Sequence, residues 1–223
     1  MTKKTVLIII SAGLLLLLVG VGITYAISEK SNMFQAGKKY KDHYSPQEIQ
    51  PEGSDQVLAV YKNMQFTKSD VEYFHDSYVL VNQEITAADS TDKEIIDRLI
   101  KGELWLEEAE RLGFVATQEE IDAMVENAQL AYTIPEGKQM LDDYLAGAEM
   151  SFEEYLDALR EQAPRTIARQ KMKNEISRRY CEENGLTYTG NNVTTAMLEA
   201  QNEYIEQVFQ QRKDQITYYL DTQ

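Results

Sequence analysis

Most of the chain after residue 66 alternates between apolar and polar positions with the period of an α-helix. The clearest stretch is 97–114, where apolar residues recur every three or four positions and Gly113 marks the end. Three polar quartets each begin with Thr or Ser and end with Asp or Glu: 67–70, 117–120 and 151–154. This spacing is typical of a capping box, in which the first and fourth residues satisfy each other's backbone N–H groups. We therefore expect a helix to begin at each quartet.

The remaining pattern predicts one strand, a turn and two more helical segments. The apolar run 57–61, closed by the turn-prone residues 62–65, predicts a short strand. Pro, Glu and Gly at 135–137 predict a turn, and a short helix is expected after it. A last helix is predicted at about 193–219. Together these patterns predict an all-α domain with one short β-strand element.

The longest periodic segment begins at Ser151 and ends at Gly185. Pro164 interrupts it, and a proline inside a helix removes one backbone donor and clashes with the preceding turn. We therefore expect either a kink at this proline or two abutting helices.

Residues 6–27 contain no charged residue and are dominated by Leu, Ile and Val. Twenty-two residues at a rise of ~1.5 Å span about 33 Å, which is enough for the ~30 Å hydrocarbon core of a bilayer. We expect one transmembrane helix that acts as an uncleaved signal-anchor, with a cytoplasmic tail at 1–5 and an extracytoplasmic domain after it. The alternative is a cleaved signal peptide, because 24–26 resembles a cleavage site.

The chain after this span divides into three predicted parts. Residues 28–54 hold Gly and Pro without an apolar period, which predicts a linker. A helical domain is expected at 55–184 and a C-terminal helical extension at 185–223. Beyond residue 28 there are 37 acidic residues against 20 basic ones, a formal charge of −17. This charge argues against nucleic acid as a partner and favours solubility beside a membrane.

No pattern in the sequence predicts catalysis, a metal or another cofactor. The two histidines are His43, in the predicted linker, and His75, which precedes Asp76 on a predicted helix. Neighbouring residues on a helix point in different directions, so His75 and Asp76 do not predict a catalytic dyad. No spacing matches a zinc site, a calcium loop or a glycine-rich phosphate loop. Cys181 stands alone, which favours a packed or exposed thiol over an activated one.

The order of these elements resembles the N-terminal chaperone domain of the SurA/PrsA family, which comprises extracytoplasmic folding factors of bacteria. The strand, polar turn and helix start are followed by a Leu-rich helix that ends in Leu-Gly and by a second capping box. The resemblance covers roughly 55–184. Its motifs are Phe66-Thr67-Lys68-Ser69-Asp70, Ile96-Asp97-Arg98-Leu99-Ile100, Glu107-Glu108-Ala109-Glu110-Arg111-Leu112-Gly113 and Thr117-Gln118-Glu119-Glu120-Ile121-Asp122.

Two departures from the family pattern shape what the resemblance implies. Family members usually have Asn-Gly in the first turn, whereas Asn63 is followed here by Met64. Many members also carry a parvulin-type prolyl isomerase domain, but only about 38 residues follow Gly185 and they lack Gly-rich strands. The resemblance therefore implies a chaperone module without the isomerase, and an isomerase hidden by divergence is a lesser alternative.

The expected function is non-catalytic binding of exposed apolar segments of unfolded or newly exported polypeptides. Met and Tyr side chains re-pack against varied partners, which suits such a surface. Several of them also lie on apolar stripes, which favours a role in the core. The alternative function is a membrane-anchored structural or adaptor protein with one dedicated cell-envelope partner. The candidate client contacts are Tyr78, Trp105, Met124, Tyr132, Met140, Tyr144, Tyr155 and Met172.

A basic stretch at 160–179 holds seven Arg and Lys residues against two Glu. In so acidic a chain, we expect most of these cations to pair with acidic helices. The alternative is a local patch for an anionic lipid, a wall polymer or an acidic client.

Overall fold

The computed structural model describes residues 30–44, 55–82, 90–190 and 193–220. For 30–31 and 77–82 it describes the backbone alone. The described part is mainly helical with one small sheet, so the predicted helical class is confirmed. The predicted transmembrane helix, 6–27, and the tail before it lie outside the described residues. Within those residues, no helix has the length and apolar character that crossing a membrane needs.

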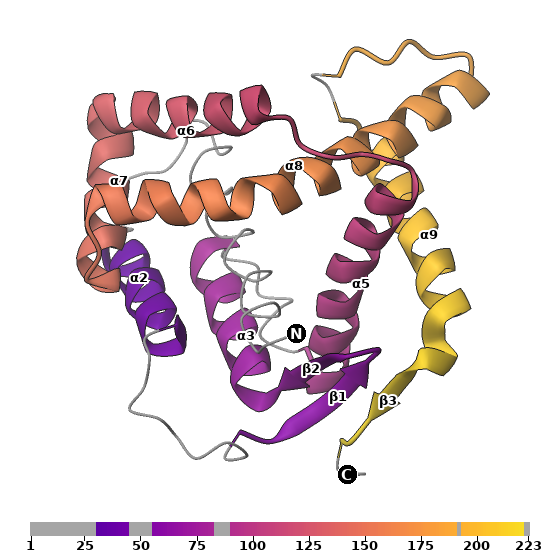
Figure 1. The fold of residues 1–223 in the computed structure, drawn as a ribbon, viewed down its shortest axis with the longest axis horizontal. Coiled ribbons are helices and arrows are strands. Elements are labelled where there is room, and N and C mark those ends of the chain that lie inside the picture. The colour runs from indigo at the N-terminus through magenta and orange to yellow at the C-terminus, as the bar shows by residue number, and fades with distance from the viewer. Residues whose placement is uncertain (1–29, 45–54, 83–89, 191–192, 221–223) are drawn as a thin grey trace.

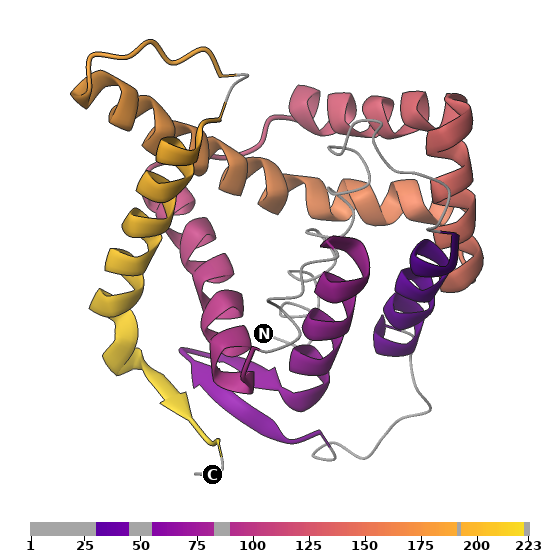
Figure 2. The same cartoon turned by 180° about the vertical axis from the view of Figure 1, so that it is seen from behind.

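The longest helix, α8, runs across the molecule and contacts helices that lie before and after it in the sequence (Figure 1). Seen from behind, α6 lies on one side of α8, and α3 and α5 extend from the other side towards the sheet (Figure 2). The elements are α2 (Lys30–Tyr44), β1 (Val57–Tyr61), β2 (Met64–Thr67), α3 (Lys68–Asn82), α5 (Asp92–Arg111), α6 (Gln118–Thr133), α7 (Pro135–Ala148), α8 (Phe152–Glu183), α9 (Thr195–Arg212), the 3-10 turn η1 (Lys213–Gln215) and β3 (Ile216–Tyr218).

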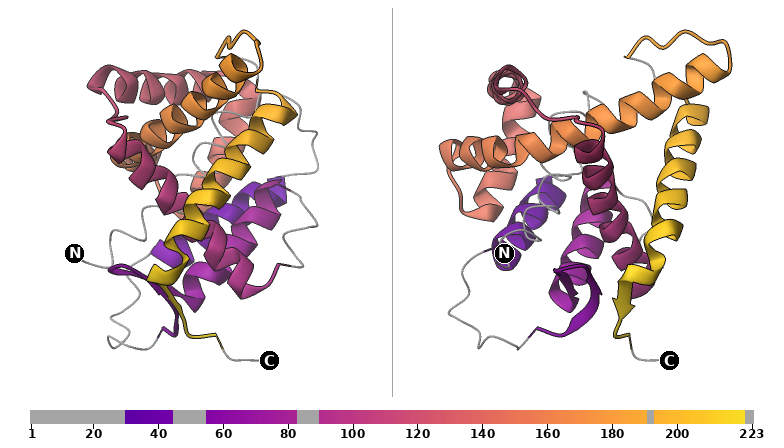
Figure 3. Two further views of the ribbon diagram at one scale, coloured as in Figure 1. Left: turned by 90° about the vertical axis from the view of Figure 1, so that its right-hand side faces the viewer. Right: turned by 45° about the vertical axis from the view of Figure 1, so that its right-hand side comes forward.

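The sheet is antiparallel with the strand order β2-β1-β3, so the last strand pairs with the first. Tyr61 of β1 lies opposite Met64 on one side and Ile216 on the other. The predicted strand 57–61 is confirmed, but the prediction of a helix up to 219 is wrong at its end. Ile216 is buried beside β1, and β-branched and aromatic residues suit a pleated, half-buried surface. Figure 3 shows α9 running beside α5 and bringing β3 to the sheet.

Two buried clusters share α8. The first, here called the sheet cluster, joins the strands, α3, α5, α9 and the second half of α8. The second, here called the helical cluster, joins α2, α6, α7 and the first half of α8. The largest fully buried members of the sheet cluster are Tyr61, Phe66, Ile96, Ile100, Leu104 and Met172. The helical cluster is formed by Met33, Ala36, Val125, Ala128, Leu141, Tyr144, Leu145, Ala148, Tyr155, Leu156 and Leu159.

Helix α2 lies inside the range 28–54 that the sequence assigned to a linker, and this part of the linker prediction is wrong. The helix packs on α7 through glycines. A Cβ atom on Gly37 would lie 2.0 Å from the carbonyl oxygen of Tyr144, and one on Gly147 would lie 2.0 Å from that of Phe34. The two backbones therefore meet at a distance that only glycine permits. Such small residues bury little apolar area, and the hydrophobic pattern did not reveal the helix.

The three predicted capping boxes are confirmed. Thr117 and Ser151 each exchange hydrogen bonds with the residue three positions later. At the start of α3, the backbone N–H of Thr67 donates to Asp70 Oδ2 at 2.8 Å, and the N–H of Asp70 donates to Thr67 Oγ1 at 3.4 Å. Two further boxes, not predicted, begin α5 at Thr91 and α9 at Thr194.

Pro164, expected to interrupt a helix, lies inside one, and Pro135, expected in a turn, lies at the start of one. Helix α8 is a single helix that contains Pro164, so the prediction of two abutting helices there is wrong. Pro164 is exposed, and the carbonyl group that it leaves without a donor lies four residues earlier on the same solvent-facing side. Pro135 begins α7, where its missing N–H costs nothing, and Gly137 lies within the helix rather than in a turn.

Candidate functional site

The basic stretch of α8 separates into paired and unpaired cations. Five of its seven Arg and Lys residues form ion pairs, as most were expected to do. Arg169 and Lys173 form none with any described residue. The pairs are Arg160–Asp157 at 2.6 Å, Arg165–Glu103 at 2.9 Å, Lys171–Glu120 at 2.7 Å, Arg178–Glu175 at 2.7 Å and Arg179–Glu175 at 2.7 Å.

Arg165, Arg169 and Lys173 follow one another at intervals of four on α8, so they share one side of the helix, here called the cationic stripe. Their nearest paired anion is Glu103 of α5, whose side chain is only 7% exposed. Nη2 of Arg165 donates to both carboxylate oxygens of Glu103, at 2.9 Å each. One carboxylate therefore attracts both Arg165 and Arg169 in a partly buried setting.

Burial shifts the pKa of each group that lacks a full set of partners. Desolvation raises the pKa of Glu103, against the attraction of Arg165 and Arg169. Desolvation lowers the pKa of Arg169, and Glu103 only partly offsets it. For Lys173, desolvation and then repulsion by Arg169 lower the pKa of the ammonium group. Desolvation is the largest cause of all three shifts, so each of these charged groups lies where little solvent reaches it.

Four buried polar atoms at this stripe have no hydrogen-bond partner in the described part of the chain. They are Nε and Nη2 of Arg169, Nε of Arg165 and Oε1 of Gln162. A buried donor or acceptor left without a partner costs about 1–3 kcal/mol, and more when the group is charged. Since native proteins leave few such atoms, a group of four at one place is a feature that needs an explanation.

The outer end of the stripe is an aromatic layer. Nζ of Lys173 lies 5.8 Å from the centroid of the Trp105 ring. The Trp105 ring stacks on that of Tyr204 at 5.8 Å with an interplanar angle of 25°. Tyr204 in turn donates a hydrogen bond from its hydroxyl group to Glu108 at 2.6 Å. This layer joins α5, α8 and α9 and fixes the position of the stripe relative to α5.

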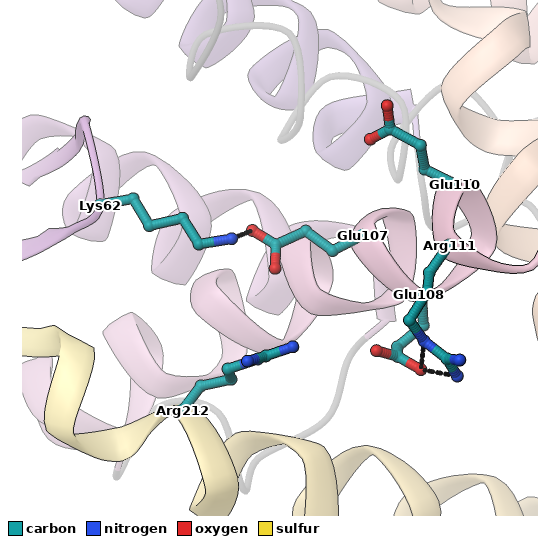
Figure 4. A pocket seen from close by; sticks show the side chains of 6 residues that line it. All are labelled: Lys62, Glu107, Glu108, Glu110, Arg111 and Arg212. Atoms are coloured by element: carbon teal, nitrogen blue, oxygen red, sulfur yellow. Dashed lines mark hydrogen bonds and ion pairs between the residues drawn. The ribbon is translucent and has the colours of Figure 1, made fainter.

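A second charged feature is a solvent-open hollow of about 290 Å³ between the β1–β2 turn, α5 and the end of α9 (Figure 4). Its cations and carboxylates largely neutralise one another. Lys62 pairs with Glu107 at 2.6 Å and Arg111 with Glu108 at 2.6 Å. Because the cations of these ion pairs are solvent-exposed and already paired, the hollow is a weaker candidate than the stripe. It is lined by Lys62, Glu107, Glu108, Glu110, Arg111 and Arg212.

Four of the eight predicted client contacts are core residues in this structure. Trp105 and Met172 belong to the sheet cluster, and Tyr144 and Tyr155 belong to the helical cluster. Their exposed fractions are 6%, 0%, 1% and 0% respectively. Large apolar side chains on a helical stripe fill the core first, and so these four offer no surface to a partner here.

Three further candidates, Met124, Tyr132 and Met140, lie half-buried at the edge of the helical cluster. The Tyr132 ring stacks on that of Phe152 at 3.9 Å, and its hydroxyl group donates to Asp142 at 2.7 Å. The eighth, Tyr78, lies in α3, and its side chain is outside the described part.

Sequence reasoning missed the apolar side chains that the structure leaves most exposed. They lie on several separate elements: Phe34, Val115, Leu130, Ile134, Leu186, Val193, Leu198 and Tyr219. Val193 and Leu198 flank the cap of α9 at the spacing of a hydrophobic staple, which explains that pair structurally. Leu130 and Ile134, four residues apart at the end of α6, have no such role.

Both histidines lie where α2 meets α3. Nε2 of His43 is 3.5 Å from Asp70 Oδ1, and the His43 ring stacks on that of Tyr73 at 4.4 Å. His75 contacts its neighbour Asp76 at 3.3 Å, and Lys39 of α2 also pairs with Asp76. Cys181 is fully buried, so of the packed and exposed alternatives that the sequence left open the structure shows the packed one. In the part of the chain that the structure describes, no group of three or more His, Cys, Asp and Glu side chains is placed to hold a metal ion.

Compared with protein-family models, with curated proteins and with solved structures, this chain matches none. The resemblance to SurA/PrsA chaperones therefore stays a prediction from the sequence pattern.

Proposed function

We propose that this protein is a membrane-anchored, extracytoplasmic chaperone of the SurA/PrsA type without an isomerase domain. It binds exposed apolar segments of unfolded exported polypeptides and releases them without catalysis. Binding an unfolded chain competes with its aggregation by mass action. The anchor in this proposal is the apolar segment 6–27, and the acidic domain after it limits self-association.

The observation that carries the proposal is the spread of exposed apolar side chains over separate elements. Within the described residues they occur on α2, before and at the end of α6, around the α8–α9 connection and after β3. A dedicated adaptor would need one contiguous apolar patch as the centre of its interface. Several small contacts suit weak binding to many different segments.

The main rival is an adaptor with one envelope partner, and α2 gives it some support. Helix α2 begins three residues after the end of the predicted span and is locked to α7 by glycine contacts. A rigid domain held close to a membrane suits a fixed complex as well as a chaperone. The two functions are separated by how many unrelated polypeptides the protein binds.

The test is light scattering from two unrelated, chemically denatured proteins as they aggregate, with the full-length chain in lipid nanodiscs. We expect suppression of both at near-stoichiometric amounts, and none from empty nanodiscs. Suppression of neither by a folded protein would reject the proposal and favour the adaptor.

A variant pair tests the surface itself. Replacing Leu130 and Ile134 by Ser should weaken suppression about twofold or more, because both side chains are exposed and lack a structural partner role. The matched control replaces the exposed polar residues Glu126 and Gln129 of the same helix by Ser. Equal suppression of aggregation by the two variants would show that Leu130 and Ile134 are not part of the binding surface.

A further inference from the structure

We propose that the cationic stripe of α8 binds a carboxylate group of the client polypeptide, with Arg169 as its principal ligand. This inference rests on the proposed function, because it names the chemistry of the segment that is held. The site is formed by Gln162, Arg165 and Arg169 of α8, opposite Glu103 of α5.

The geometry of the unsatisfied atoms selects a carboxylate. Nε and Nη2 lie on the same edge of the Arg169 guanidinium group, and both lack a partner among the described residues. This edge presents two parallel N–H donors, the fork that matches the two oxygen atoms of one carboxylate. Glu103 does not fill it in this structure, because its oxygen atoms accept from Nη2 of Arg165 and not from Nε or Nη2 of Arg169.

The charge balance favours an added anion. Arg165 and Arg169 share one carboxylate partner, Glu103, and burial desolvates the guanidinium group of Arg169 and the ammonium group of Lys173. The rest of the protein is acidic, with a net charge of −15. A carboxylate at Arg169 would therefore be held by a local cationic site within a surface that otherwise repels it.

Gln162 indicates that the carboxylate belongs to a polypeptide. Its Oε1 atom is a buried acceptor with no donor in the described ranges, and it lies seven residues before Arg169, on the same side of α8. An extended polypeptide offers backbone N–H donors beside an acidic side chain, which inorganic anions do not. Since the Arg169 nitrogen atoms are inaccessible in this structure, binding requires the side chains around the stripe to move.

The experiment measures fluorescence anisotropy of labelled apolar peptides with the full-length chain in nanodiscs. Three peptides are compared: one with a central Glu and an amidated end, the same with Gln, and the Gln peptide with a free C-terminal carboxylate. We expect the Glu peptide to bind at least tenfold more tightly than the amidated Gln peptide. If only the third peptide binds more tightly than the amidated Gln peptide, the site recognises the C-terminal carboxylate of a chain. That result would overturn the proposal that it holds an acidic side chain within a segment.

Four variants test which side chains cause the preference for the Glu peptide. Arg169→Gln should abolish the preference for Glu, and Arg169→Lys should retain only part of it because the two-donor fork is lost. Glu103→Gln should strengthen binding of the Glu peptide several-fold by removing the internal competitor. Arg160→Gln, which alters an exposed cation already paired with Asp157, is the control and should change nothing.

Each contrary result has a separate meaning. Equal binding of the Glu and amidated Gln peptides, or a preference that survives Arg169→Gln, overturns the carboxylate site even if aggregation is still suppressed. A Glu preference without suppression of aggregation leaves the site intact and rejects the holding function. Displacement of the Glu peptide by millimolar inorganic phosphate identifies a general anion site and overturns the polypeptide assignment, as does failure of every peptide to bind.

Discussion

The sheet cluster and the helical cluster share α8 but are built in different ways. The sheet cluster joins segments as distant in sequence as β1 and β3, and it uses branched aliphatic residues of α5. The helical cluster takes its residues from 33–159 and closes on the glycine contact of α2 with α7. The first is held by large side chains that interlock, and the second by backbones that approach closely.

Two tyrosines of each cluster differ in how their hydroxyl groups are bonded. In the sheet cluster, the hydroxyl group of Tyr61 donates to Glu107 at 3.0 Å, and that of Tyr218, packed against the cluster, donates to Asp97. In the helical cluster, the hydroxyl groups of Tyr144 and Tyr155 are buried with no partner in the described part of the chain. Because an unsatisfied buried hydroxyl costs free energy, these two hydroxyl groups should lower the stability of the helical cluster.

The largest effect should come from cavities made in either cluster. Leu159→Ala and Met172→Ala each remove a fully buried side chain, at a cost of about 2–5 kcal/mol. The single tryptophan, Trp105, reports on the sheet cluster, whereas circular dichroism reports on all helices. In urea, we expect Leu159→Ala to move the circular dichroism transition below the Trp105 transition, and Met172→Ala to lower the Trp105 midpoint. If the circular dichroism and Trp105 transitions of Leu159→Ala coincide, the two clusters unfold as one cooperative unit. The difference in stability between them would then not exist.

The sheet cluster was easier to predict from the sequence than the helical cluster, because large side chains leave a pattern in the sequence and close backbone contacts do not. The helix at 97–114 was predictable because large aliphatic residues give a strong periodic signal, and Leu99, Ile100 and Leu104 lie on the buried side of α5. Helix α2 was missed because its contact depends on Ala36 and Gly37. β3 was missed because three residues become a strand only through pairing with β1, far away in the sequence.

A smaller effect should follow from separating α2 and α7. Gly147→Ala places a methyl group against the backbone of Phe34, so the helices must part at a cost of about 1–3 kcal/mol. Hydrogen exchange should show faster exchange of α2 and α7 amides and unchanged exchange in β1. The control is Ala146→Leu, at an exposed position one residue earlier, which should leave both regions protected. Equal loss of protection in the sheet would indicate that the helical cluster supports the sheet cluster.

The candidate site was predicted only in part. The basic stretch is visible in the sequence, and so is the expectation that acidic helices pair with it. Which cations remain unpaired depends on the approach of Glu103, 62 residues before Arg165. The proposed client contacts followed from the adaptability of Met and Tyr, yet Tyr155 and Met172 are fully buried. Residue type alone does not decide between a core and a binding surface; position on the packed face does.

The tyrosine contrast is tested by removing one hydroxyl group from each cluster. Tyr61→Phe removes a hydrogen bond to a carboxylate and should lower the free energy of unfolding by about 1.5 kcal/mol. Tyr155→Phe removes a buried hydroxyl without a partner in the described ranges and should be neutral or stabilising by up to ~1 kcal/mol. Both values come from urea denaturation. A loss of stability in Tyr155→Phe as large as that in Tyr61→Phe would show that the hydroxyl of Tyr155 is satisfied after all.

The smallest effect should be a loss of stability in acid that depends on Glu175, near the end of α8 that packs in the sheet cluster. Hydrogen bonds from Arg178 and then Arg179 lower the pKa of Glu175 to about 2. A carboxyl group whose pKa is lowered by folding stabilises the protein at pH values above the pKa that the group has in the unfolded chain. This contribution to the free energy of unfolding is lost as the pH falls from about 4.5 towards 2. Because both arginines are more than a third exposed, solvent screening limits each pair to ~1 kcal/mol or less. The free energy of unfolding of Glu175→Gln should therefore lie slightly below that of the unmodified chain at pH 7 and meet it near pH 2. Glu126→Gln, on exposed α6, is the control. A gap of the same size at both pH values would mean that Glu175 acts through packing rather than charge, and that acid does not distinguish the two ends of α8.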